Sequence, residues 1–239
     1  MRSRLYQTVG IVLGRRDYGE ADRVVICLTP QGRVGLLAKG TRKPQSRKAG
    51  HLELFARTKL LVSRVEHSWD IISQAEAEVL RPILQDDLQR GTYARYIAEL
   101  VMRFFEQEAN ETLYELLDGT LTTLERDELP ELLVRWTEQR LLTLAGFRPE
   151  WLSCVGDDTG DLCGEVLRPR RADRRMYGID PERGGALCPT CYAAGRRLPG
   201  VRGLSPSALS WLQALQQRDY EDVKQFPFPG RQSSRHSLR

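Results

Sequence analysis

The sequence predicts an α+β protein with an N-terminal β-barrel, a helical middle and a cysteine-bearing module inserted towards the C-terminus. Three observations predict this class. Short runs rich in Val and Ile fill residues 6–78, apolar residues then recur at helical spacing up to residue 149, and four of the five cysteines fall within residues 151–203. With 41% apolar and 28% charged residues, the composition is that of a folded protein and not of a disordered or fibrous one.

Five strands are expected in the first part of the chain, which we take as a domain of residues 1–80. The strands are predicted over residues 7–13, 23–29, 33–39, 57–64 and 69–77. Pro30 presets φ and Gly32 permits a positive φ, so these residues form the turn between the second and third strands. Five strands in about 75 residues fit a small closed barrel, for which the OB-fold is the commonest arrangement.

The hydrophobic period changes after the fifth strand, which predicts a helical domain over residues 81–150. Apolar side chains share one helical stripe in residues 93–104 and another in residues 113–124. A third helix takes Pro130 in its first turn and stops at Gly146. Stripes of this kind are normally core, so these helices are assigned to packing and not to a cofactor.

The remaining segments are assigned from composition and capping residues. Residues 151–203 are irregular and form the cysteine module. Ser205 can cap a last helix that has Pro206 at its first position, so residues 204–225 are expected to pack back on the helical domain. Residues 226–239 are rich in Pro, Gly, Ser and Arg and are predicted to be a disordered tail.

The strongest chemical feature is a group of cysteines with the spacing C-x8-C-x24-C-x2-C, formed by Cys154, Cys163, Cys188 and Cys191. Thiolates suit a borderline-soft ion such as Zn²⁺, which binds four of them in a tetrahedron. A small segment with few apolar residues gains from a metal the stability that a core would otherwise supply. We therefore predict one structural Zn²⁺ per chain, although the first gap is longer than the usual two to four residues.

Two other interpretations of the cysteines remain open. They could be ordinary reduced thiols, or Cys188 and Cys191 could form a redox dithiol. A redox pair should open a helix after a strand, and no βαβ pattern surrounds this one, which favours zinc. Cys27 lies in a strand rich in Val and Ile and is expected to be a buried core thiol.

No catalytic site is predicted. Four thiolates close the coordination sphere, whereas a catalytic zinc keeps an open position. His51, His67 and His236 are isolated, and none belongs to an H-E-x-x-H or a zinc-deaminase pattern. The sequence also has no Walker A loop, no G-x-S-x-G and no dinucleotide-binding G-x-G-x-x-G. We therefore expect a protein that is not an enzyme.

Charge is distributed unevenly, although the net charge is only +4. Residues 1–80 carry fourteen Lys or Arg against eight Asp or Glu, residues 81–150 carry eight against fourteen, and the remainder carries fourteen against ten. Two basic segments therefore flank an acidic one, and a polyanion would meet the basic ends of the chain.

Contacts with a polyanion are predicted first in the loop of residues 39–50, which holds five cations and no acid. On a small barrel this loop borders the groove where oligonucleotides lie, so its cations would contact phosphates. The predicted contacts are Lys39, Arg42, Lys43, Arg47 and Lys48, with Arg15 and Arg16 extending the cationic track. Tyr18 and Phe55 are candidate stacking platforms for bases. The alternative is a loop that is merely solvated.

A second cluster of arginines lies inside the cysteine module and just beyond its last cysteine. It consists of Arg168, Arg170, Arg171, Arg174, Arg175, Arg196 and Arg197. Arginine suits bidentate contact with phosphate, whereas a surface built for solubility alone mixes Lys with acids. Two basic surfaces on one chain would allow two strands, or two parts of one strand, to be held together.

The residues described so far resemble the RecO family of bacterial recombination mediators over nearly the whole chain. The N-terminal similarity is carried by residues 9–13 and 18–20, by Thr29 and Gly32, and by residues 39–42 with Ser46 and Arg47. Residues 141–149 resemble the end of the helix before the zinc site of that family, residues 184–191 resemble its second zinc knuckle, and Leu204 and Ser205 open the last helix. One departure is the insertion 155–162, where the family often has C-x2-C-G.

The resemblance implies an OB-fold, a helical body and a zinc module that bind single- and double-stranded DNA and anneal complementary strands. It also implies RecR, often RecF, and single-strand-binding protein as partners in loading RecA on coated DNA. It implies no catalytic residue. From the residues alone, an RNA-binding or translation-associated protein with the same barrel and zinc knuckle stays open, as does an assembly scaffold whose barrel contacts only protein.

The expected location is cytoplasmic and nucleoid-associated. The apolar runs are far too short to span a bilayer, and the Arg-rich N-terminus has no apolar stretch of the kind found in a signal peptide. Disulfides are disfavoured in that compartment, which supports reduced or metal-bound cysteines.

Overall fold

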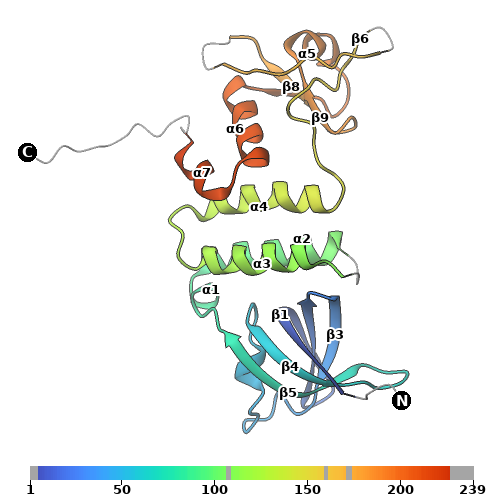
Figure 1. Ribbon diagram of the computed structural model, residues 1–239, viewed down its shortest axis with the longest axis vertical. Coiled ribbons are helices and arrows are strands. Elements are labelled where there is room, and N and C mark those ends of the chain that lie inside the picture. The colour runs from blue at the N-terminus through green and yellow to red at the C-terminus, as the bar shows by residue number, and fades with distance from the viewer. Residues whose placement is uncertain (1–4, 106–108, 159–160, 171–173, 227–239) are drawn as a thin grey trace, which may run out of the picture. The chain divides into compact units, whose positions relative to one another are not determined.

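The computed structural model describes residues 5–105, 109–158, 161–170 and 174–226 (Figure 1). The chain forms two compact units, residues 1–137 and 138–239. The boundary between them falls inside helix α4, Pro130–Leu144. All of the predicted tail except Phe226 lies outside the described residues.

The first unit begins with a closed five-stranded barrel. Its strands are β1 Leu5–Tyr18, β2 Asp22–Thr29, β3 Gly32–Ala38, β4 Arg57–Ser63 and β5 Asp70–Val79. They follow the order β1-β2-β3-β5-β4, and β1 pairs with β4 to close the ring. Among these five strands, β3 and β5 pair in parallel and the other neighbours are antiparallel. Each strand overlaps its predicted range, and the predicted OB-fold barrel is confirmed.

Strand β1 belongs to two sides of the barrel. Residues 5–11 pair with β4 and residues 11–18 pair with β2, with a shift of register between Val12 and Gly14. A bulge of this kind bends a strand and increases its twist, which lets one strand turn a corner of the barrel. The prediction ended this strand at residue 13 and placed Arg15 and Arg16 in the turn that follows, which is wrong because both residues lie in β1 and pair with β2.

Inward-facing aliphatic side chains fill the barrel. Val12, Val25, Leu36 and Leu60 belong to this core and are at most 1% exposed. Cys27 lies among them, and its burial raises the pKa of the thiol to about 12. The prediction of a buried core thiol is confirmed.

Helices follow the barrel in the first unit. They are α1 Ile83–Asp86, α2 Leu88–Phe104, α3 Glu111–Leu124 and the first half of α4. A short 3₁₀ turn, η1 Ala49–Leu52, lies earlier in the chain, between β3 and β4. Asp87 and Asn110 cap α2 and α3, because their side chains accept hydrogen bonds from backbone N–H groups. The three long helices confirm the predicted stripes, whereas α1 is too short to show one. No helix within the described ranges has the length and apolar character needed to cross a membrane.

A buried arginine joins the barrel to α3 within the first unit. Arg81 is 0% exposed and donates hydrogen bonds to the carbonyl oxygen of Phe55 at 2.5 Å and to the hydroxyl of Thr122 at 2.9 Å. Its guanidinium also lies 2.6 Å from the carboxylate of Asp118. Arg57 of β4 reaches the same carboxylate at 2.5 Å. A charge out of water needs such partners, so this network fixes α3 on the barrel.

The second unit combines small sheets with short helices. After the second half of α4, its elements are β6 Asp157–Asp158, β7 Asp161–Leu162, β8 Tyr177–Asp180, β9 Gly185–Leu187, α5 Pro189–Gly195, β10 Arg202–Leu204, α6 Pro206–Gln217 and α7 Tyr220–Gln225. One antiparallel sheet has the order β10-β8-β9, and β6 pairs with β7 in a hairpin. Trp151, Leu167, Tyr177 and Leu209 pack together with the cysteines in the core of this unit.

The last helices are tied to the second half of α4. Ser205 accepts a hydrogen bond from the N–H of Ala208 at 3.1 Å and so caps α6, which begins at Pro206 as predicted. Arg140 of α4 donates to the carbonyl oxygen of Gln216 at 2.6 Å, just before α6 ends. The cap and this anchor fix both ends of α6.

Candidate metal centre and nucleic-acid surface

Four cysteines converge in the second unit. The sulfur atoms of Cys154, Cys163, Cys188 and Cys191 all lie within 4.8 Å of one another. Sulfur atoms in a tetrahedron about 2.3 Å from a zinc ion would be about 3.8 Å apart, so only small shifts separate this cluster from a loaded site. The cluster could hold a metal ion, and its all-sulfur donor set suits a soft or borderline-soft one.

The long gap between the first two cysteines folds back on itself. Strands β6 and β7 lie within this gap, and at their base the N–H of Cys163 donates to the carbonyl oxygen of Gly156 at 2.8 Å. The N–H of Gly164 donates to the carbonyl oxygen of Cys154 at 3.2 Å, and Gly164 takes the left-handed conformation with φ 61°. The hairpin therefore closes the gap, and the unusual spacing does not separate the two sulfur atoms.

Backbone N–H groups point at the sulfur atoms. Cys154 Sγ accepts from the N–H of Gly156 at 3.3 Å and from the N–H of Cys188 at 3.1 Å. Cys188 Sγ accepts from the N–H of Cys191 at 3.4 Å. Such bonds favour the thiolate, which is the form that ligates metals. A Cβ at Gly156 would lie 2.7 Å from the sulfur of Cys191, so the cluster leaves no room for a side chain there.

The second cysteine pair opens a helix after a strand, contrary to expectation. Strand β9 ends at Leu187, Cys188 caps α5, and Cys191 lies in its first turn. The sequence argument against a redox dithiol is therefore wrong. The other two cysteines still favour a metal site, because a dithiol has no use for two further sulfur atoms at this distance and the four together could hold a metal ion.

His51 and His67, the two histidines that the structure describes, take no part in the cluster. The Nδ1 of His51 accepts a hydrogen bond from the N–H of Ala77 at 3.2 Å, which assigns this ring to the barrel. His67 lies in the turn between β4 and β5 with φ 61°, and His236 lies outside the described residues. Among the side chains that the structure describes, only cysteines form the group that could hold a metal ion.

The basic loop, residues 39–50, follows β3 and is tied to the barrel near both ends. The N–H of Gly40 donates to the carboxylate of Asp22 at 2.8 Å, and the hydroxyl of Thr41 donates to a backbone carbonyl. Lys48 Nζ donates to the carbonyl oxygen of Ile72 in β5 at 3.0 Å, and partial burial lowers the pKa of this lysine. The loop therefore follows a fixed course.

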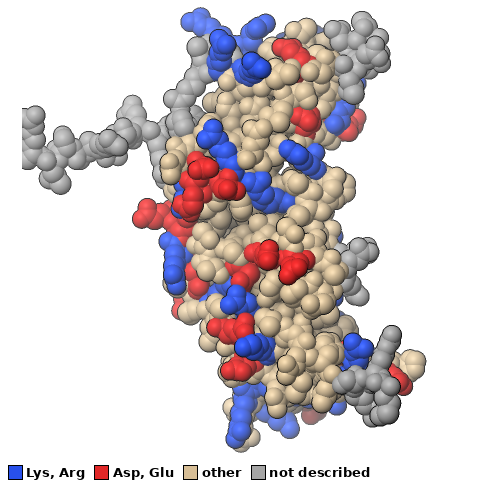
Figure 2. Space-filling view, in the orientation of Figure 1, with Lys and Arg blue, Asp and Glu red and all other residues tan. Residues whose placement is uncertain are grey.

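Several cations of the basic loop have no partner among the described residues. The exposed ones without a hydrogen bond or ion pair to any described residue are Lys39, Lys43 and Arg47. Arg42 instead lies 3.3 Å from the carboxylate of Asp17. Figure 2 shows Lys and Arg side chains protruding at the lower edge of the barrel as drawn. The loop thus presents free positive charge to solvent.

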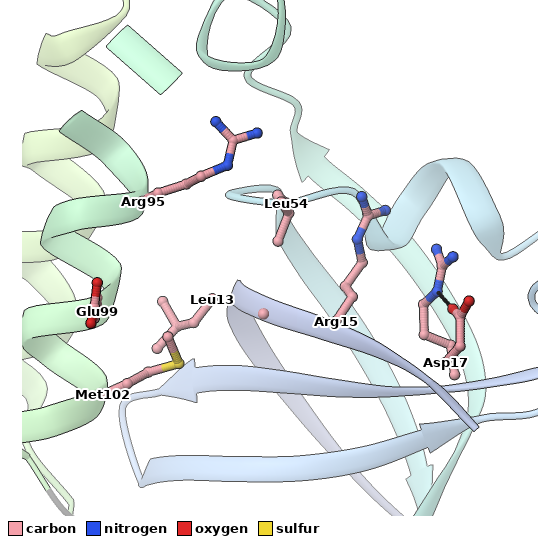
Figure 3. A pocket seen from close by; sticks show the side chains of 9 residues that line it. Leu13, Arg15, Asp17, Leu54, Arg95, Glu99 and Met102 are labelled. Carbon is pink, nitrogen blue, oxygen red and sulfur yellow. Dashed lines mark hydrogen bonds and ion pairs between the residues drawn. The ribbon is translucent and has the colours of Figure 1, made fainter. Parts of the chain in front are cut away.

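Arg15 lines a cavity between β1 and α2 (Figure 3). The cavity has a volume of about 470 Å³ and is lined by Leu13, Gly14, Arg15, Asp17, Arg23, Leu54, Arg95, Glu99 and Met102. Arg15 pairs with Glu53 at 2.8 Å, and Arg23 pairs with Asp17 at 3.1 Å. The cavity is therefore lined by charges of both signs, and Arg15 already has a carboxylate partner in Glu53.

The two aromatic residues predicted to stack on bases differ in exposure. Tyr18 is 49% exposed at the end of β1. Phe55 is only 1% exposed, and its N–H donates to the carbonyl oxygen of Val12 at 2.8 Å. The prediction for Phe55 is wrong, because a ring buried in the core cannot stack on a base.

The second arginine cluster is exposed wherever the structure describes it. The exposed residues are Arg168, Arg170, Arg174, Arg175, Arg196 and Arg197. Arg171 lies outside the described residues. In Figure 2, Lys and Arg side chains gather on the upper part of the unit that carries the cysteines. Some members of this cluster precede β8 and others follow α5. The first group follows Cys163 and the second follows Cys191, so the cysteine cluster links the two segments that carry the arginines.

Sequence analysis missed one surface residue of the barrel, Trp69. Its ring is 38% exposed and lies over Gly35 of β3, with the guanidinium of Arg16 at 5.6 Å from a ring centroid. The available indication was a tryptophan at the first position of the predicted fifth strand of an expected OB-fold, residues 69–77. Its neighbours could not be foreseen, because they depend on the pairing of β3 with β5.

Comparison with known proteins covers both parts of the chain. A family model described as Recombination protein O N terminal matches residues 1–80, and one described as Recombination protein O C terminal matches residues 85–235. The chain is 39% identical over 223 residues to DNA repair protein RecO of Roseiflexus sp. strain RS-1, covering 92% of this chain and 73% of that protein. It is 36% identical over 219 residues to DNA repair protein RecO of Symbiobacterium thermophilum, covering 88% of this chain and 79% of that protein. The DNA repair protein RecO of Synechocystis sp. is 31% identical over 230 residues, with 94% and 82% covered.

Proposed function

This chain belongs to the RecO family of DNA repair proteins, and from that premise we propose that it acts as a recombination mediator. In this role it binds single- and double-stranded DNA and anneals complementary strands. Together with RecR and RecF, it helps to load RecA on DNA coated by single-strand-binding protein, a role that would place it at the nucleoid. RecO is not a known enzyme family, and we assign no catalytic residue.

The observation that carries this proposal is the free basic loop on the OB-fold barrel. Lys39, Lys43 and Arg47 have no partner in the described part of the chain, while Lys48 and the loop ends are held on the barrel. A cation that is free and exposed gains more from a phosphate than one already paired with a carboxylate. Arg16 adds a further exposed cation on β1, and Arg15 and Arg42 would first have to leave Glu53 and Asp17.

We assign the second DNA contact to the arginine cluster of the cysteine module. The assigned residues are Arg168, Arg170, Arg171, Arg174, Arg175, Arg196 and Arg197. Two separate basic surfaces suit an annealing protein, because each can hold one strand. The functional parts of the chain are then residues 1–80 for DNA, 81–150 as helical body, 151–203 as zinc module and 204–225 as the packing helix.

We also assign one structural Zn²⁺ per chain to Cys154, Cys163, Cys188 and Cys191. The convergence of four sulfur atoms and the N–H groups directed at them support this assignment. A bound zinc ion would supply stability to a segment with little apolar core and no chemistry, since four thiolates leave no open position.

The test combines DNA binding with strand annealing. Arg42, Lys43, Arg47 and Lys48 are replaced together by Gln, and the affinity for single-stranded DNA is measured at several salt concentrations. About four phosphate contacts in the loop contribute about −3 to the slope of log K against log salt, so the substitutions should flatten the slope by about that amount and leave the part that comes from the arginine cluster. Annealing of complementary strands without ATP, on coated DNA with and without RecR, should slow in parallel.

Arg126→Gln is the matched control, because it also removes an exposed positive charge but lies outside both basic surfaces. It should leave the slope and the annealing rate unchanged. A quadruple variant with the slope of the wild-type protein would sink the assignment to the loop. Competition with RNA strands of the same sequence separates a DNA preference from general binding of nucleic acid.

A further inference from the structure

Trp69 is an exposed aromatic side chain to which the proposed function gives no role. It is 38% exposed and lies at the end of the loop between β4 and β5. The parallel register aligns Asp70 with Leu36, which places Trp69 beside Gly35 of β3. The face formed by strands two and three and the loop between strands four and five are the places where OB-folds bind oligonucleotides.

The ring of Trp69 packs directly against the backbone of Gly35. A Cβ at Gly35 would lie 2.3 Å from Cζ3 of Trp69, well inside the 3.5–4.0 Å at which carbon atoms normally touch. Gly35 does not have a positive φ, so its backbone conformation does not require glycine. The contact with the indole ring is therefore what excludes a side chain at this position.

The loop that carries Trp69 is held at its base. The carboxylate of Asp70 accepts from the N–H of Val65 at 2.9 Å and from the hydroxyl of Tyr6 at 3.1 Å. Arg64 lies over the ring of Tyr6, with its guanidinium 5.1 Å from the ring centroid. A short loop with both ends fixed presents the indole in a defined place, so little entropy is lost when a ligand contacts it.

Cations lie close to the indole ring. The guanidinium of Arg16 lies over the indole ring, 5.6 Å from a ring centroid, so a base that stacks on the ring would take its place and leave it for a phosphate. Arg16 has no ion pair within the described part of the chain. Lys48 of the basic loop contacts Ile72, three residues along β5 from Trp69, which is about 10 Å at the rise of a strand. An exposed aromatic ring beside a cationic path is the combination that single-strand binding uses, with stacking for the base and charge for the phosphate.

We infer that Trp69 is a stacking platform for an unpaired base of single-stranded DNA, with Arg16 contacting the phosphate beside that base. This inference rests on the proposed DNA-binding function and deepens it by naming a contact that selects unpaired bases. Bases within a duplex are stacked on one another and offer no free face to the indole. The Trp69 contact therefore serves single strands, whereas the basic loop serves either form.

The experiment compares variants of the full chain in titrations with an oligothymidylate of about 15 nucleotides, near the upper site size of one OB-fold. Trp69→Ala should weaken binding about 5- to 100-fold, the loss expected for one stacked base. The slope of log K against log salt should stay as in the wild-type protein, because stacking releases no counterions. Binding of a duplex should change less than about twofold, since its bases do not reach the ring.

Two further variants separate stacking from folding. Trp69→Phe should keep most of the affinity. Its remaining fluorescence comes from Trp136, Trp151 and Trp211, and the oligonucleotide should quench it less than that of the wild-type protein, because the tryptophan on which the base stacks is gone. Gly35→Ala should reproduce the loss seen with Trp69→Ala, since the new Cβ displaces the ring. Circular dichroism and thermal unfolding establish that each variant is folded.

The outcomes distinguish this inference from the proposed function. If Trp69→Ala binds single strands as well as the wild-type protein does, the platform is overturned and the DNA-binding function stands. An equal loss for single strands and duplex would also overturn it, because Trp69 would then act on the fold alone. If the wild-type protein binds neither form at moderate salt, both proposals fail together.

Discussion

Asp118 on α3 receives two guanidinium groups, from Arg57 of β4 and from Arg81 after β5. Arg81 is fully buried, so its charge depends on this carboxylate and on the carbonyl oxygen of Phe55. A lone arginine between Leu80 and Pro82 gives no local indication of such a role, since its partner lies 37 residues further on. Sequence analysis therefore missed the residue that joins the barrel to α3.

Asp118→Ala is expected to destabilise the protein by about 3–5 kcal/mol, because it leaves the buried charge of Arg81 without a counter-charge. The shift of the urea midpoint measures this change. Glu99→Ala is the matched control, since it breaks an ion pair with Arg103 in which both side chains are largely exposed. That control should cost less than about 1 kcal/mol, and similar losses for the two variants would contradict the importance of burial.

At the level of elements, the predictions succeeded where the pattern is local. The five strands and three long helices each carry a period of two or about 3.6 over enough residues to be recognised. The end of β1, the short helices α1, α5 and α7 and the strands of the second unit escaped prediction. Those strands span only two to four residues and are held by one another and by the packing around the cysteines.

The candidate site divides in the same way. The spacing of the cysteines was enough to predict that Cys154, Cys163, Cys188 and Cys191 would meet, because a C-x2-C turn already joins two of them. The hairpin that closes the first gap was not predicted. Trp69 was missed for a different reason. Its ring packs on Gly35 of β3 and lies near Arg16 of β1, and only the closed barrel brings these strands together.

Ser205→Ala is expected to destabilise α6 by about 1 kcal/mol, because it removes the hydroxyl that accepts from the N–H of Ala208. Thermal unfolding of the full chain measures the loss. Ser210→Ala within the same helix is the control, and it should be neutral or slightly stabilising because Ala is the better helix former. A loss as large for Ser210→Ala as for Ser205→Ala would show that the cap is not the cause.

For the whole molecule, removal of the proposed zinc ion should affect the two units differently. The cysteine cluster lies in the core of residues 138–239, whereas the barrel has an aliphatic core of its own. A chelator should therefore open the second unit to proteolysis and leave the barrel protected. The purified protein should contain about one zinc ion per chain, which metal analysis measures.

The matched control for the metal is Cys27→Ala, which removes a cysteine outside the cluster and should keep the zinc content unchanged. Cys188→Ser should lose the metal and show the chelator-treated pattern of proteolysis without chelator. Four free thiols and no metal in the fresh wild-type protein would refute the zinc assignment.

Closure of the barrel has a consequence for self-association. Because β1 pairs with both β2 and β4, none of the five strands is an end strand, and the backbone left for a neighbouring copy lies mainly in the stretches of β3 and β5 outside their two-residue pairing. Strand addition between copies gathered on one DNA molecule is therefore limited to those stretches, and most contacts between crowded copies would have to be made by side chains and loops.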